Sequence, residues 1–169
     1  LTLYRVSENG GDMQREPVKP MVLVNHVLQD AADYAEHQRV DCKLVASEES
    51  KAVSVLGDSS LLQRAFDNVL QNALDHTPPG KSVKLSLSTD NERIRLIVAD
   101  EGPGAPEDLL QHLFEPFFRA DKSRGGKGWG LGLAIARDII QAHDGHISAR
   151  NRDEGGLEVT LELPVFVGG

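Results

Sequence analysis

The sequence predicts an α+β fold, a two-layer sandwich in which helices pack against a sheet. Segments that alternate apolar and polar residues, as β-strands do, outnumber those with helical periodicity. Two neighbouring strands are joined by a short turn, which is typical of an antiparallel hairpin. A parallel, doubly wound sheet would instead need a crossover, usually a helix, between successive strands.

The first part of the chain is predicted to contain a linker, a helix and two short strands. Residues 1–16 are polar and glycine-containing, and they lead into two prolines, which is typical of a linker. From Met21 to Ala35, apolar residues recur at steps of three and four, which predicts a helix. Alternating residues then predict strands at 40–44 and 53–55.

The most regular helix is predicted between Asp58 and Pro78. Asp58, Ser59 and Ser60 are each suited to an N-cap, and apolar pairs repeat every four residues from Leu61 to Leu74. The remaining elements are strands 83–87 and 94–99 joined as a hairpin, a short helix at 106–113, a helix at 133–143 closed by Gly145, and strands 147–149 and 157–163.

Composition excludes several classes of protein. The 169 residues suit a single domain, and their net charge of −8 argues against general binding to nucleic-acid phosphates. The apolar runs are only a few residues long, whereas a membrane-spanning helix needs roughly 20. The single Cys42 excludes an internal disulfide and fits a reducing compartment.

Two asparagines of the long helix form a candidate metal site. Asn68 and Asn72 are four residues apart, so they project from one side of the helix. Asparagine is a mediocre helix former, and amide oxygens suit Mg²⁺, which also binds phosphate oxygens. The alternative is two ordinary asparagines on a solvated face. His76 extends the series by another four residues and is a candidate for the same ligand.

Asp100 is a candidate for recognising a base. It ends an apolar strand and is followed by Gly102 and Gly104. A carboxylate can accept a hydrogen bond from an exocyclic amine such as that of adenine, and glycines let the backbone approach a ring closely. The alternative is an ordinary Asp-Gly turn.

A glycine-rich segment is a candidate for phosphate binding. Five glycines lie between Gly125 and Gly132 and lead directly into a helix, whose free N–H groups and dipole attract anions. The pattern matches neither a P-loop nor a dinucleotide-binding fingerprint. The loop carries a local charge of +3, from Arg119, Lys122, Arg124 and Lys127 against Asp121. This charge favours a bound polyanion, and the alternative is a mobile surface loop.

Taken in order, these features resemble the N box, first glycine box, F box and second glycine box of bacterial sensor histidine kinases. The corresponding segments are 68–73, 100–104, 114–119 and 128–133, and the resemblance covers residues 16–164. It implies a mixed, mainly antiparallel sheet covered on one face by helices, with an ATP lid between the F box and the second glycine box. Type II topoisomerases, mismatch-repair ATPases and a heat-shock chaperone share this fold.

The resemblance implies ATP and Mg²⁺ as cofactors and gives each motif a role. Asn72 would hold Mg²⁺ with help from Asn68. Asp100 would receive the adenine amine, and Gly102 and Gly104 would shape the purine pocket. The other nucleotide-contacting residues would be His76, the lid residues Arg119, Lys122 and Arg124, and the second-glycine-box residues Gly128, Trp129, Gly130, Leu131, Gly132 and Leu133.

Two residues depart from the family pattern. Asp75 stands where relatives often have Lys or Arg near the phosphates, so that cationic contact is either missing or supplied by the lid. Trp129 replaces a small Thr or Ser, and its ring would either cover the nucleotide or pack the lid.

The expected reaction is phosphoryl transfer to another domain. The related ATPases carry a water-activating glutamate at the position of Asn68, whose amide cannot act as a general base. None of the six histidines has the context of a phosphoacceptor, which is His followed by an acidic residue, Leu, Arg, any residue and Pro. The alternatives are a stand-alone ATPase or ATP-gated module of the same fold, and a degenerate interaction domain that binds no nucleotide.

The resemblance also divides the chain and implies partners. Residues 1–15 would be the end of a dimerisation helix and a linker, and residues 16–169 the catalytic domain. The partners would be the parent's own phosphoacceptor domain and, through the full-length kinase, a response regulator. We expect a monomeric, cytoplasmic fragment that contacts neither nucleic acid nor membrane, from a homodimeric parent anchored in the bacterial inner membrane.

Overall fold

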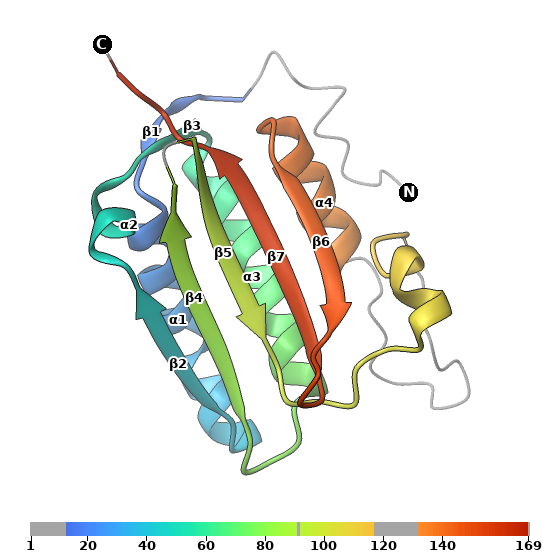
Figure 1. The fold of residues 1–169 in the computed structure, drawn as a ribbon. Coiled ribbons are helices and arrows are strands. Elements are labelled where there is room, and N and C mark those ends of the chain that lie inside the picture. The colour runs from blue at the N-terminus through green and yellow to red at the C-terminus, as the bar shows by residue number, and fades with distance from the viewer. Residues whose placement is uncertain (1–12, 91, 117–131, 169) are drawn as a thin grey trace.

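The computed structural model describes residues 13–90, 92–116 and 132–168. A five-stranded sheet has the strand order β2-β4-β5-β7-β6, and α1, α3 and α4 pack on one of its faces (Figure 1). In chain order the elements are β1 (Glu16–Val18), α1 (Pro20–Gln38), β2 (Asp41–Ala46), α2 (Glu48–Ala52), β3 (Val55–Gly57), α3 (Ser59–His76), β4 (Ser82–Thr89), β5 (Arg93–Ala99), the 3-10 helix η1 (Glu107–His112), α4 (Gly132–Ala142), β6 (His146–Asn151) and β7 (Leu157–Pro164).

The sheet is mixed and mainly antiparallel, so the predicted fold class is confirmed. The pair β2–β4 is parallel, whereas β4–β5, β5–β7 and β6–β7 are antiparallel. The predicted hairpin between β4 and β5 is also confirmed, and the Asp90 carboxylate fixes its turn by accepting from the N–H groups of Glu92 and Arg93, at 2.8 Å each.

Helix α3 is the central helix of the core. Its Asp58 N-cap accepts from the Leu61 N–H at 3.1 Å, as the sequence predicted. The apolar face of α3 is buried, and Phe66 is only 2% exposed. Because this face is fixed against the sheet, the side that carries Asn68 and Asn72 is fixed as well.

Two short elements were not predicted from the sequence. Strand β1 pairs with β3 in a separate two-stranded sheet, although its residues were interpreted as the end of a linker. Helix α2 occupies a segment for which no helix was predicted, and the Ser47 side chain caps it by accepting from the Ser50 N–H at 3.2 Å. Three and five residues are too few to show a periodicity.

The end of α4 differs in detail from the prediction. Asp144, with φ of 62°, takes the left-handed conformation that a terminal glycine often supplies. Gly145 still donates its N–H to the Ile140 carbonyl at 2.9 Å. A Cβ at Gly145 would lie 2.3 Å from the Glu162 carbonyl oxygen, so glycine is required there by the close approach of β7.

His143 joins the end of α4 to the start of α3. The ring is 3% exposed, its Nδ1–H donates to the Ile139 carbonyl at 2.7 Å, and Nε2 accepts from the Asp58 N–H at 3.0 Å. The bond accepted by Nε2 requires the neutral ring, since a protonated Nε2 cannot accept. Burial lowers the pKa of His143, and the Arg15 cation lowers it further. The hydrogen bond to the Ile139 carbonyl and the Asp58 and Asp144 carboxylates raise it in part.

We expect His143 to make folding stability depend on pH. A lowered pKa means that unfolded His143 binds a proton more readily, so its stabilisation is present above about pH 6.5 and decreases as the pH falls below it. The free energy of unfolding should therefore fall by up to about 1.4 kcal/mol per pH unit from this residue. Denaturant unfolding of the wild type, His143→Gln and the exposed control His26→Gln, at pH 7.5 and 5.5, measures it. An identical pH slope in His143→Gln would contradict this assignment.

None of the helices among the described residues combines the length and the apolar character needed to cross a bilayer.

Candidate functional site

The two asparagines of α3 lie beside the start of α4. The Asn68 amide nitrogen donates to the Gly132 carbonyl at 3.2 Å, and Gly132 is the first residue of α4. Asn72 is 9% exposed, and none of the described residues forms a hydrogen bond with its side-chain amide. The structure therefore brings Asn68 next to the end of the predicted second glycine box.

His76 brings the end of α3 to the loop that follows β5. Its Nδ1–H donates to the Asn72 carbonyl at 2.8 Å. A Cβ at Gly102 would lie 2.3 Å from the His76 carbonyl oxygen, so only glycine allows the loop to come this close. The end of α3, just beyond the N box, and the first glycine box are thus in contact.

Asp100 is held in one orientation. It is 2% exposed, and its Oδ1 accepts from the N–H groups of Gly102 and Leu157, both at 2.9 Å. Among the described residues, no hydrogen bond reaches Oδ2. Burial raises the pKa of Asp100, while the two backbone N–H groups, His76 and Arg152 counteract the rise. One carboxylate oxygen is therefore committed to the fold.

The second glycine of this loop has a different neighbour. Gly104 has a φ of +74°, and a Cβ there would lie 2.6 Å from Asn151 Oδ1. The Asn151 side chain accepts from the Ala105 N–H at 2.9 Å and donates to the Ala105 carbonyl at 2.6 Å. The end of β6 thus fastens the loop, a role for Asn151 that no local sequence pattern indicated.

Asp75 has a partner on a different helix. The Tyr34 hydroxyl of α1 donates to Asp75 Oδ1, and this hydrogen bond together with burial raises the pKa of Tyr34. The carboxylate that departs from the family pattern therefore links α1 to α3.

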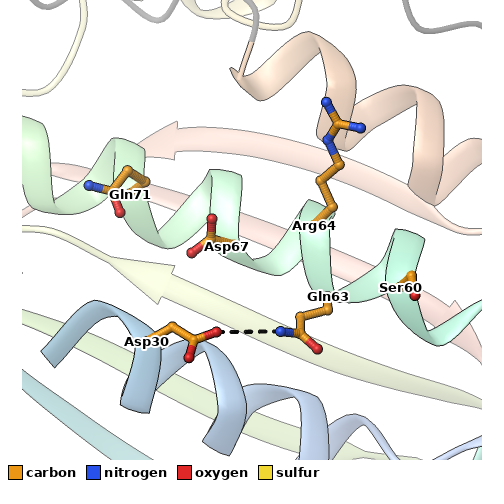
Figure 2. Close-up of a pocket in the computed structure, with 6 residues that line it drawn as sticks. All are labelled: Asp30, Ser60, Gln63, Arg64, Asp67 and Gln71. Atoms are coloured by element: carbon orange, nitrogen blue, oxygen red, sulfur yellow. Dashed lines mark hydrogen bonds between the residues drawn. The ribbon is translucent and has the colours of Figure 1, made fainter.

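A polar groove of about 540 Å³ lies along the same two helices (Figure 2). The Gln63 side-chain amide donates to the Asp30 carboxylate across the groove at 3.5 Å. Burial raises the pKa of Asp67, and the nearby negative charge of Asp30 raises it further. Its lining residues are Asp30, Ser60, Gln63, Arg64, Asp67 and Gln71. No residue predicted for nucleotide binding lines this groove.

Part of the predicted site lies outside the described residues, namely Arg119, Lys122, Arg124, Gly128, Trp129, Gly130 and Leu131. Of the second glycine box, Gly132 and Leu133 are described, and the Leu133 side chain is fully buried in the core. The F-box residue Phe114 is buried as well, 8% exposed. In the described part of the chain, no group of three or more His, Cys, Asp or Glu side chains could hold a metal ion.

Comparison with known proteins identifies the family. The model of the Histidine kinase-, DNA gyrase B-, and HSP90-like ATPase family matches residues 57–166. The chain belongs to this family. Membership implies ATP binding, and the sequence-based identification is confirmed.

Similar proteins are sensor histidine kinases. The signal transduction histidine-protein kinase BaeS of Escherichia coli is 40% identical over 116 residues, which are 68% of this chain and 25% of BaeS. The structure of the mycobacterial sensor histidine kinase MprB is 30% identical with a TM-score of 0.77, over 90% of this chain and 98% of that one. Full-length ShkA in complex with AMPPNP is 26% identical with a TM-score of 0.79, over 94% of this chain and 32% of that one. This chain spans between 22% and 37% of the first curated relatives.

Proposed function

We propose that this chain is the catalytic domain of a sensor histidine kinase, which binds Mg²⁺–ATP and donates the γ-phosphoryl group to a histidine on a separate phosphoacceptor domain. The observation that carries the proposal is the buried Asp100, whose Oδ1 is held by two N–H groups while Oδ2 has no donor among the described residues. The relative ShkA, in complex with AMPPNP, supports a nucleotide as the ligand.

The asparagines fit a magnesium ion by their chemistry. Mg²⁺ prefers oxygen ligands and keeps several waters and phosphate oxygens, so it needs few protein ligands. The Asn68 nitrogen is engaged by Gly132, which leaves its oxygen for the metal or its waters, and Asn72 would be the direct ligand. When bound, the metal would neutralise charge on the phosphates.

The base and the phosphates would be held by different parts of the chain. Asp100 Oδ2 would accept the adenine amine beside Gly102 and Gly104. The phosphates would lie at the N-terminus of α4, where backbone N–H groups of residues 128–133 and the helix dipole favour anions. His76, which lies against Gly102, would contact the same nucleotide. Arg119, Lys122 and Arg124 would contribute positive charge, and Trp129 would cover the nucleotide or pack the lid.

At position 68 the chain lacks the carboxylate that activates water in the related ATPases. Asn68 stands where the related ATPases carry a glutamate, and its amide is a hydrogen-bond donor to Gly132 rather than a base. Phosphoryl transfer depends mainly on positioning and on charge stabilisation, which one domain can supply to a nucleophile on another. The asparagine at position 68 therefore favours the kinase proposal over a stand-alone ATPase.

The proposal extends to the division of the chain and to its partners. Residues 1–15 would form the end of the dimerisation helix and the linker, and residues 16–169 the catalytic domain. The phosphoacceptor domain of the parent would be the direct partner, and a response regulator would act through the whole kinase, a homodimer anchored in the inner membrane. This chain alone would be monomeric.

We expect the isolated chain to bind ATP without consuming it. Incubated with radiolabelled ATP, it should release almost no phosphate and acquire no phosphohistidine. Addition of the purified phosphoacceptor domain of the same parent should allow slow labelling of that domain, because the tether that raises effective concentration is absent. Rapid phosphate release by the chain alone would favour the ATPase alternative, and labelling of one of its own six histidines would contradict the proposed location of the substrate.

A further inference from the structure

The turn between β6 and β7 lies against the backbone of Asp100. Arg152, in this turn, donates from Nη1 to the Asp100 carbonyl oxygen at 2.6 Å and to the Gly155 carbonyl at 3.3 Å. Its Nη2 pairs with Glu154 at 2.8 Å, and the Arg152 side chain is 20% exposed. A half-buried arginine side chain therefore bonds directly to the backbone of the residue that would recognise the base.

The same turn contacts Asp100 at three further points. The Asp100 N–H donates to the Leu157 carbonyl at 2.9 Å, and the Leu157 N–H donates to Oδ1. Gly156, with φ of +100°, lies so close that a Cβ there would be 2.1 Å from the Asp100 carbonyl oxygen. Residues 152–157 thus form hydrogen bonds with three groups of Asp100: its N–H, its carbonyl oxygen and one carboxylate oxygen.

We propose that Arg152 is a positioning residue for base recognition. Its hydrogen bond to the Asp100 carbonyl oxygen fixes the backbone of that residue, and its positive charge helps to keep the carboxylate an acceptor for the adenine amine. This inference rests on the proposed function and assigns part of the base specificity to a residue that does not touch the base.

The charges around Asp100 support this contribution, in addition to the hydrogen bond from Arg152 to the Asp100 carbonyl. Burial raises the pKa of Asp100, and the N–H groups of Leu157 and Gly102, His76 and the Arg152 guanidinium counteract the rise. The neighbouring Glu101 carboxylate is directed to the Ser82 N–H at 2.6 Å, and Glu154 is held by Arg152 itself. Without Arg152, the Asp100 carbonyl oxygen loses a charged donor, so the position of Asp100 is less fixed. The carboxylate also loses a compensating positive charge, which favours its protonation.

A matched control lies two residues earlier. Arg150 pairs with Glu158 at 2.7 Å, but its side chain is 66% exposed and makes no hydrogen bond to Asp100. Replacement of Arg150 removes the same charge from the same strand end, so a comparison of Arg150→Met with Arg152→Met separates the contact from a general loss of positive charge.

The test compares two nucleotides that differ by the amine. Displacement of a fluorescent nucleotide is measured with ATP and with purine riboside triphosphate, which lacks the 6-amino group. In Arg152→Met, ATP affinity should fall about tenfold, as expected for one charged hydrogen bond, while the affinity for the analogue stays unchanged. Arg152→Lys should recover part of the preference, and Arg150→Met should keep all of it.

The remaining outcomes overturn the inference. An equal loss of affinity for both nucleotides would assign Arg152 a merely structural role, and an unchanged preference would remove it from base recognition. If Arg152→Met does not fold in a thermal-unfolding control, Arg152→Gln, which keeps a donor without the charge, carries the same comparison. Failure of the wild type to bind ATP would instead overturn the proposed function itself.

Discussion

Replacement of Asn72 by alanine is expected to abolish Mg²⁺-dependent nucleotide binding and leave the fold intact. Asn72 is 9% exposed on α3, and no hydrogen bond to its amide from the described residues would be lost. Alanine is also the better helix former, so α3 should be preserved. Loss of the metal ligand should lower the affinity for a non-hydrolysable ATP analogue in Mg²⁺ by at least about 100-fold.

The measurement is a nucleotide titration with and without Mg²⁺. Without the metal, wild type and Asn72→Ala should differ little, because the removed group acts through the ion. Asn25→Ala, on the exposed side of α1, is the matched control and should behave as the wild type. Asn72→Asp should keep a metal ligand but bring a negative charge close to the phosphates. Unchanged affinity of Asn72→Ala in Mg²⁺ would exclude this residue from the site.

Replacement of Asp100 by asparagine should change which base is preferred. The asparagine oxygen can still accept from Gly102 and Leu157, so its amide nitrogen would take the place of Oδ2. A donor would then face the adenine amine, which is also a donor, whereas guanine presents a carbonyl oxygen at that ring position. ATP affinity should fall by about 10- to 150-fold, which corresponds to the free energy of a hydrogen bond to a charged group. The affinity for GTP should rise relative to that for ATP.

Competition between ATP and GTP measures this prediction directly. Asp153→Asn, in the exposed part of the β6–β7 turn, is the control for the loss of one negative charge. The unfolding temperature of Asp100→Asn should differ little from that of the wild type even though the base preference changes, because the two backbone hydrogen bonds to the side chain remain. Equal binding of ATP and GTP by the wild type would contradict a recognition role for Asp100.

The local motifs could be predicted from the sequence because each depends on short spacings. Four-residue repeats fixed the face of α3 that is buried, and hence the side that carries Asn68 and Asn72. Alternation predicted β4, a more continuous apolar run predicted β5, and the turn at Asp90 predicted the hairpin. These features follow from the geometry of single elements, in which neighbours in the chain are neighbours in space.

Other features depend on contacts between distant segments and could not be predicted. β1 is a strand only because β3 lies beside it, and the parallel pairing of β2 with β4 spans the whole of α3. His143 was predicted only to lie at a helix end, yet its ring bonds the N-cap residue of α3. No periodicity of the intervening chain encodes such pairings.

The sequence by itself determined the fold class and identified the asparagine pair and Asp100 as candidates. The tertiary structure decided how Asp100 is held, since Leu157 and Arg152, more than fifty positions away, bond its carboxylate and its carbonyl. It also decided that Asp75 bonds to Tyr34 of α1. The physical reason is that a buried polar group must be satisfied by whichever donor the packing brings near, and that donor is chosen by the arrangement of whole elements rather than by local spacing.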